Sequence, residues 1–153
     1  MLNEDYRDIL QALCAEKARF LIVGAYALAA HGFPRATLDI DLWVQPSPEN
    51  AAAVFRALQS FGAPLQTLTK ADFEQTDTIF QIGVAPRRID IITGVSGLKF
   101  EEAYAHSVAT EIEGLQLRVL SRDDLIVNKR ASGRTKDLAD AETLEADRDA
   151  KHD

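Results

Sequence analysis

The sequence is poor in cysteine and has no long apolar run. Its one cysteine, Cys14, has no partner within the chain for a disulfide, which fits a reducing compartment. No apolar run approaches the roughly 18 residues that a membrane span needs. The acidic start MLNEDYRDIL also lacks the basic stretch and apolar core of a signal peptide. We therefore expect a soluble, cytoplasmic protein.

Positive charge is also scarce. The 153 residues include 17 lysines and arginines against 24 aspartates and glutamates, so the formal net charge is -7. An extended nucleic-acid interface needs a basic face, and this composition argues against one. A local basic patch is still compatible with it. The length suits one domain with a single sizeable core.

Hydrophobic periodicity divides the chain into helices and short strands. Apolar residues at helical spacing predict a helix within residues 1–17, and a charged segment with one apolar stripe predicts helices within 121–148. Short connections indicate two hairpins, formed by runs 79–84 with 88–93 and 108–112 with 115–120. The sum is an α+β fold with a mixed or antiparallel sheet of about five strands and helices packed on it. We expect a single domain over 1–153.

Two aspartates interrupt the apolar strand that begins at Leu38. Strand alternation places Asp39 and Asp41 on one face, with their carboxylates side by side. Two such charges repel each other unless a cation lies between them, and hard oxygen ligands suit Mg²⁺ or Mn²⁺. The competing interpretation is that both acids are simply exposed on an edge strand. Their strongly apolar neighbours favour the metal site.

A third acid, Asp90, lies inside another apolar run, RIDII. Alone, it is better explained as a half-exposed strand residue. If its strand lies beside that of Asp39 and Asp41, the three carboxylates form a cluster able to hold two metals about 3.5–4 Å apart for phosphoryl chemistry. Asp90 can also accept the proton from an incoming hydroxyl.

Gly24 and Ala25 follow a short apolar strand and begin an alanine-rich helix. Glycine at such a turn lets backbone N–H groups approach a phosphate, with the helix N-terminus directed at it. A simple reversal of the chain is the competing explanation, and it is the better one for a turn taken by itself.

Taken in order, these features resemble the minimal nucleotidyltransferases of the DNA polymerase β-like superfamily. That family carries a strand, a Gly-Gly or Gly-Ser turn, a helix, a strand with D-x-D or D-x-E, and a third acid on a later strand. More narrowly, the segment 23–50 looks like the branch related to AbiEii-type toxins. Further motifs of that branch are matched by Arg35 and Thr37, by Lys129, and by Arg134, Lys136, Asp137 and Asp140.

The resemblance implies a polymerase-β-like fold with its motifs over about 20–144. It also implies metal-dependent transfer of a nucleoside monophosphate from a triphosphate such as ATP to a hydroxyl. The acceptor is an RNA end, a protein or a small molecule. The AbiEii-type branch points to a toxin-like role on tRNA, with an antitoxin as a candidate partner.

The resemblance also implies a role for each matched residue. The predicted metal ligands and catalytic acids are Asp39, Asp41 and Asp90, with Lys129 as a further catalytic residue; the predicted nucleotide-binding residues are Gly24, Ala25, Arg35, Arg134 and Lys136. Lys129 and Arg134 would neutralise the triphosphate or the leaving pyrophosphate, unless they lie on a solvated helix face. Asp137 can instead pair with Lys129 or Lys136 and orient it, and we predict Asp140 on the helix surface.

Ala25 departs from the family pattern, which has Gly or Ser at this position. Alanine has no hydroxyl to donate to a phosphate, so we expect weakened or altered triphosphate binding. The main alternative is therefore a catalytically impaired, nucleotide-binding or regulatory protein on the same fold. A metal-dependent nuclease is a weaker alternative, because it does not explain a glycine turn ahead of the carboxylates.

Overall fold

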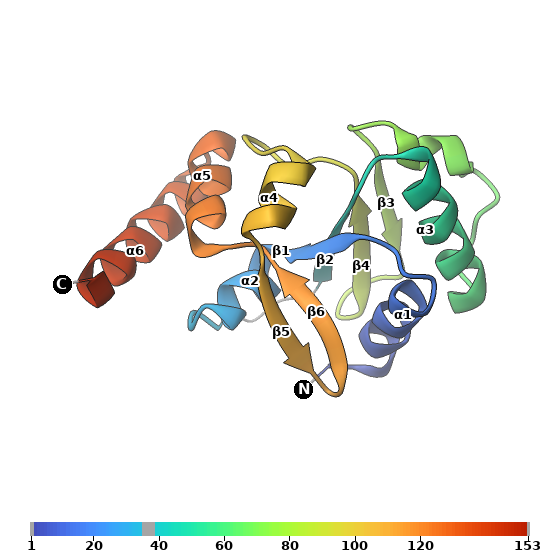
Figure 1. The fold of residues 1–153 in the computed structure, drawn as a ribbon, viewed down its shortest axis with the longest axis horizontal. Coiled ribbons are helices and arrows are strands. Elements are labelled where there is room, and N and C mark those ends of the chain that lie inside the picture. The colour runs from blue at the N-terminus through green and yellow to red at the C-terminus, as the bar shows by residue number, and fades with distance from the viewer. Residues whose placement is uncertain (1, 35–38, 153) are drawn as a thin grey trace.

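The computed structural model describes residues 2–34 and 39–152. Helices and strands are interspersed along the chain; the strands form one sheet, and the helices lie around it (Figure 1). The elements are α1 (Glu4–Ala15), β1 (Phe20–Val23), α2 (Gly24–Ala30), β2 (Asp39–Val44), α3 (Pro48–Phe61), the 3-10 helix η1 (Lys70–Glu74), β3 (Ile79–Ile82), β4 (Arg88–Ile92), α4 (Phe100–His106), β5 (Val108–Ile112), β6 (Leu115–Val119), α5 (Arg122–Ser132) and α6 (Thr135–His152).

The sheet is mixed and has six strands in the order β3-β4-β2-β1-β6-β5. The second strand, β2, runs antiparallel to β1 and parallel to β4. Both predicted hairpins are present, as the antiparallel pairs β3–β4 and β5–β6. The expected number of about five strands was slightly low. Because β6 also pairs with β1, both strands of the second hairpin join the same sheet.

The ends of the longer helices have clear local causes. The Ser47 hydroxyl accepts a hydrogen bond from the backbone N–H of Asn50 and caps α3, which ends at Gly62 in the left-handed conformation. The Ser121 hydroxyl caps α5 in the same way, through the N–H of Asp124. In the described part of the chain, no helix combines the length and the apolar character needed to cross a membrane.

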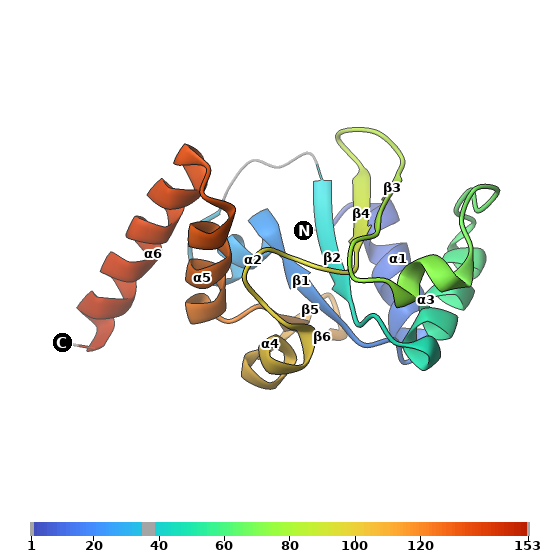
Figure 2. The ribbon, with the colours of Figure 1, turned by 90° about the horizontal axis from the view of Figure 1, so that it is seen from above.

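The two faces of β2 differ as strand alternation predicts. Ile40, Leu42 and Val44 are fully buried in the core, whereas Asp39 and Asp41 on the other face are only partly buried. In the second view, α2, α5 and α6 lie to one side of β2 and β4, and α1 and α3 lie to the other (Figure 2). The acidic face of β2 is thus only partly covered.

Candidate metal centre

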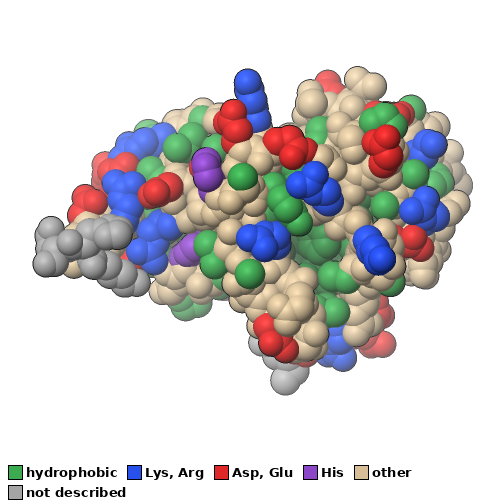
Figure 3. All heavy atoms as spheres, in the orientation of Figure 1, with side chains coloured by type: hydrophobic (Ala, Val, Ile, Leu, Met, Phe, Trp, Pro, Cys, Tyr) green, Lys and Arg blue, Asp and Glu red, His purple; other side chains and the backbone are tan. Residues whose placement is uncertain are grey.

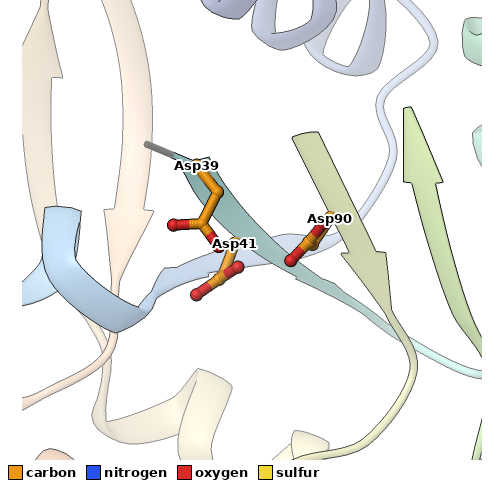
Figure 4. Close-up of side chains that lie close together, drawn as sticks. All are labelled: Asp39, Asp41 and Asp90. Carbon is orange, nitrogen blue, oxygen red and sulfur yellow. The ribbon is translucent and has the colours of Figure 1, made fainter. Parts of the chain in front are cut away.

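Strand pairing brings the three predicted aspartates together. In the parallel pair β2–β4, Asp41 is the register partner of Asp90, and Asp39 lies two residues earlier on the same face. One carboxylate oxygen from each residue lies within 4.8 Å of the others (Figure 4). The predicted three-carboxylate cluster is thus present, and the adjacency of β2 and β4 is what completes it.

Gly24 packs directly against this cluster. Its φ of +69° is a conformation that side chains with a Cβ rarely adopt. A Cβ added at Gly24 would also lie only 2.3 Å from Oδ2 of Asp41. Val23, the residue before it, is the register partner of Asp41 in the pair β1–β2. The turn therefore needs glycine for two reasons, and its backbone lies beside a carboxylate.

The Asp41 carboxyl is hard to ionise without a cation. Burial, followed by the negative charges of Asp39 and Asp90, raises its pKa from 3.8 to about 7. A divalent cation at the cluster would reverse this effect, because it stabilises the ionised form. The cluster thus has the oxygen ligands and the excess negative charge that suit Mg²⁺ or Mn²⁺.

Stability of the metal-free protein should therefore fall as pH rises. The pKa of Asp41 is higher in the folded chain than in the unfolded one, so the folded state binds more protons between about pH 4 and pH 7. We expect the free energy of unfolding in EDTA to drop by about 2 kcal/mol between pH 5 and pH 8, relative to Asp41→Asn. Denaturant titrations of both proteins at each pH measure this. If the free energy of unfolding changed with pH in the same way in both proteins, this prediction would be wrong.

Arg88 is a member of the cluster that our interpretation of the sequence missed. Its Nη2 donates to Oδ2 of Asp39 at 2.7 Å, and its Nε donates to Oδ1 of Asp90 at 3.1 Å. Strand alternation was a usable signal, because Arg88 lies two residues before Asp90 and so shares its face. Two of the three carboxylates thus already bind a cation, the guanidinium of Arg88. This supports the interpretation that the cluster can bind a metal ion.

Replacing Arg88 by Gln tests whether this guanidinium competes with metal. Because Arg88 occupies oxygens of Asp39 and Asp90, we expect Mn²⁺ to bind Arg88→Gln several-fold more tightly than wild type. Isothermal titration calorimetry without nucleotide measures the affinity. Arg87→Gln is the matched control. Arg87 lies one residue before Arg88 and pairs with Asp5, so the substitution removes the same charge outside the cluster. Weaker metal binding by Arg88→Gln alone would mean that Arg88 organises the carboxylates instead.

Tyr6 holds the backbone of Arg88 in place. Its hydroxyl, on α1, donates to the backbone carbonyl of Arg88 at 3.0 Å, and its ring meets that of Tyr26 edge to face at 5.7 Å. Burial, with smaller contributions from Tyr26 and Asp39, raises the pKa of Tyr6 to about 12. The phenol therefore remains a neutral donor, and it links α1 to the start of the strand that carries Asp90.

Lys129 lies in a separate ionic network between α5 and α6. Its Nζ lies 3.4 Å from Oδ1 of Asp137 and 3.2 Å from Oδ2 of Asp140. Asp137 also accepts from Arg134 Nε at 2.7 Å and from the Ser132 hydroxyl at 2.6 Å. The pKa of Asp137 is lowered because these hydrogen bonds and the Lys129 charge outweigh its burial. Of the two partners expected for Asp137, the structure shows Lys129.

One expectation for this region was wrong. Asp140 is buried rather than on the helix surface, because it faces α5 and pairs with Lys129. Lys136 is exposed, and the side chain of Arg134 is 81% exposed despite its pair with Asp137. Roles for these residues toward a nucleotide stay predictions. Arg35 and Thr37 lie outside the described residues.

Comparison with known proteins agrees with the geometry. A solved structure from Thermotoga maritima, TM1012, described as a candidate nucleotidyltransferase, matches with a TM-score of 0.59 and 19% identity, over 95% of this chain and 94% of that chain. Identity this low shows a shared fold, and it confirms the predicted fold class. None of the curated proteins compared matches the sequence.

A family model also matches the sequence, over nearly the whole chain. Residues 2–146 match the family described as "Nucleotidyltransferase of unknown function (DUF6036)". This supports the predicted nucleotidyltransferase assignment, while the narrower AbiEii-type branch stays a prediction. Since the match covers nearly the whole chain and the aspartate cluster lies within it, the chain belongs to the DUF6036 family of nucleotidyltransferases.

Proposed function

We propose that this protein uses Mg²⁺ or Mn²⁺ to transfer a nucleoside monophosphate from a nucleoside triphosphate to a hydroxyl acceptor. The observation that carries the proposal is the cluster of Asp39, Asp41 and Asp90, whose carboxylate oxygens lie within 4.8 Å of one another and against the Gly24 turn. Three acids beside a strand-to-helix turn suit phosphoryl transfer, in which positioning and charge neutralisation dominate.

The proposal gives Asp90 a role that differs from that of Asp39 and Asp41. Asp39 and Asp41 would hold both metal ions, and Asp90 would complete the second metal site. The metal ions supply neutralisation of the phosphate charge. Asp90 accepts the proton of the acceptor hydroxyl, whose oxygen forms a bond to the α-phosphorus. The bond between the α-phosphorus and the bridging oxygen breaks, and pyrophosphate leaves with that electron pair.

The start of α2 is the candidate phosphate-binding turn. Its N-cap residue, Val23, makes no side-chain hydrogen bond to the helix, and the N–H groups of the first turn are the donors proposed for a phosphate oxygen. Gly24 and Ala25 would therefore bind through backbone donors, which alanine retains. Lys129, Arg134 and Lys136 are candidates to neutralise the triphosphate. The ion pairs of Lys129 with Asp137 and Asp140 would need to loosen before it could do so.

The acceptor is the least constrained part of the proposal. The likeness to the AbiEii-type branch favours a toxin-like transfer to tRNA under the control of an antitoxin. The net charge of -7 argues against a large RNA surface and favours a protein or a small molecule. A screen of acceptors with labelled triphosphate separates these classes.

Incubation with each labelled triphosphate and Mg²⁺ tests the activity. We expect pyrophosphate release and label on one acceptor class in the presence of Mg²⁺, and neither product when EDTA replaces the metal. Absence of transfer with all four nucleotides and all three acceptor classes would contradict the proposal. Release of nucleotides from bare RNA without added triphosphate would point to a nuclease instead.

A second candidate is a nucleotide-binding regulatory protein without turnover. Two observations favour it: Ala25 lacks the hydroxyl of the usual serine, and Arg88 pairs with two of the three carboxylates. Metal-dependent triphosphate binding with no pyrophosphate release under any acceptor condition would support this candidate over the enzyme.

A further inference from the structure

A cavity of about 390 Å³ lies away from the aspartate cluster. It is bounded by the segment from the end of α1 to the start of β1, by Tyr104 of α4, and by Gly114 together with β6. Figure 3 shows a hollow near the middle of this face, with hydrophobic side chains at its floor and lysine and arginine side chains around its rim. The cations that line it are Lys17, Arg19 and Arg118, and no aspartate or glutamate of the described chain lines it.

Arg118 is the unusual member of this cavity. Every other arginine in the described ranges forms an ion pair with a carboxylate, whereas Arg118 forms none there. Its guanidinium is nevertheless held in place, because Nε donates to the Ser107 hydroxyl at 2.6 Å and Nη2 donates to the Ser107 carbonyl at 2.9 Å. Arg118 is therefore a half-buried cation that is held in position without a carboxylate among the described residues to balance its charge, as a site for an anion requires.

A second arginine lies against the same aromatic ring. The guanidinium carbon of Arg19 is 4.4 Å from the centroid of the Tyr104 ring, and that of Arg118 is 5.6 Å from it. Arg19 also pairs with Glu101 at 3.5 Å, but both side chains are largely exposed, so solvent weakens this ion pair. Two cations on one ring repel each other, and an anion bound between them removes that repulsion.

We propose that this cavity is a binding site for a phosphate group, either as inorganic phosphate or as the phosphate of a monoester. Arginine suits phosphate because its guanidinium donates charge-assisted hydrogen bonds. The bonds to Ser107 use Nε and Nη2 of Arg118 and leave Nη1 as a donor to the phosphate, and Lys17 adds a third positive charge. The volume accommodates a phosphate with a small organic group attached. This site is separate from the aspartates and does not depend on the proposed transfer activity.

Calorimetric titration at low ionic strength tests the site. Inorganic phosphate, AMP and adenosine are each added to the full chain in EDTA, so that no metal can hold phosphate at the aspartates. We expect saturable binding of phosphate, of AMP or of both, and none of adenosine; the pattern separates inorganic phosphate from a monoester. Binding should weaken about tenfold or more in Arg118→Met, because a charge-assisted contact is lost.

Two further variants make the result specific. Arg56→Met removes the same charge from an exposed arginine that pairs with Glu16 outside the cavity, and it should bind as wild type does. Lys17 has a φ of +56°, so Lys17→Gly removes a cavity charge while relieving backbone strain. We expect it to fold and to bind phosphate a few-fold more weakly.

Three outcomes would overturn the site. The first is no binding of either phosphate probe to wild type, and the second is binding of adenosine as tight as that of AMP. The third is wild-type affinity in Arg118→Met. If Arg118→Met fails to fold, unchanged affinity in Lys17→Gly is sufficient to reject the proposal.

Discussion

Asp41→Asn is expected to abolish tight divalent-metal binding and to lower nucleotidyl transfer about a thousandfold, yet to stabilise the metal-free protein. Asp41 is the central acid of the cluster, since it follows Asp39 on β2 and is the register partner of Asp90 on β4. An amide at this position offers a neutral oxygen in place of a charged one. It therefore replaces a charged metal ligand by a weaker, neutral one while leaving the size of the side chain nearly unchanged.

The opposite effect on stability comes from the same charge. Burial and the neighbouring acids raise the pKa of Asp41 to about 7, so an ionised carboxylate there destabilises the metal-free fold at pH 8. Asparagine carries no charge, and we expect it to stabilise this state by about 2 kcal/mol after allowance for solvent screening. Saturating Mn²⁺ should narrow the difference, because only the wild type gains stability from binding.

Thermal unfolding and Mn²⁺ calorimetry on the same samples measure both effects. Asp8→Asn is the matched control, because it removes one charge from an exposed aspartate on α1. We expect this control to change neither the metal affinity nor the melting temperature appreciably. If Asp41→Asn bound metal and transferred nucleotide as wild type does, the assignment of the aspartate cluster as the metal centre would be wrong.

Gly24→Ala should damage the site through the backbone alone. The substitution places a Cβ at a φ of +69° and 2.3 Å from Oδ2 of Asp41, so either the turn or the carboxylate must move. We expect a destabilisation of at least about 2 kcal/mol and a loss of metal affinity of tenfold or more. Both effects follow although no ligand side chain is removed.

Gly62→Ala is the control that separates the energetic cost of a positive φ from the cost of a steric clash. Gly62 ends α3 with a φ of +91°, but nothing lies within 4 Å of a Cβ added there. We expect this control to lose about 1 kcal/mol of stability from the unfavourable φ and to keep its metal affinity. Denaturant titration and Mn²⁺ calorimetry on both variants give the comparison. Equal metal affinity in the two variants would mean that the turn does not support Asp41.

These experiments also bear on the choice between an enzyme and a nucleotide-binding protein. Arg88 holds carboxylates that a metal ion needs, and Ala25 reduces the donors available to a phosphate. If both features only tune affinity, Arg88→Gln should bind metal more tightly and still release pyrophosphate. If they mark a chain without turnover, the tighter metal binding should appear without pyrophosphate release.

Local patterns in the sequence were enough to predict much of the fold. Alternation along β2 places Asp39 and Asp41 on one face whatever the rest of the chain does, because successive side chains of a strand point to opposite sides. Helical spacing likewise predicted α1 and helices within 121–148, and short turns predicted both hairpins. The same alternation could have identified Arg88, since it shares a face with Asp90.

Contacts between distant segments were decided only by the tertiary structure. Asp39 and its ion-pair partner Arg88 are 49 positions apart in the chain, and the order of the strands brings them together. The burial of Asp140 depends on the packing of α6 against α5, and the cavity around Arg118 depends on three segments meeting. Periodicity along a chain sets which way a side chain points. Which other side chain it meets depends on the pairing of strands and helices far apart in sequence.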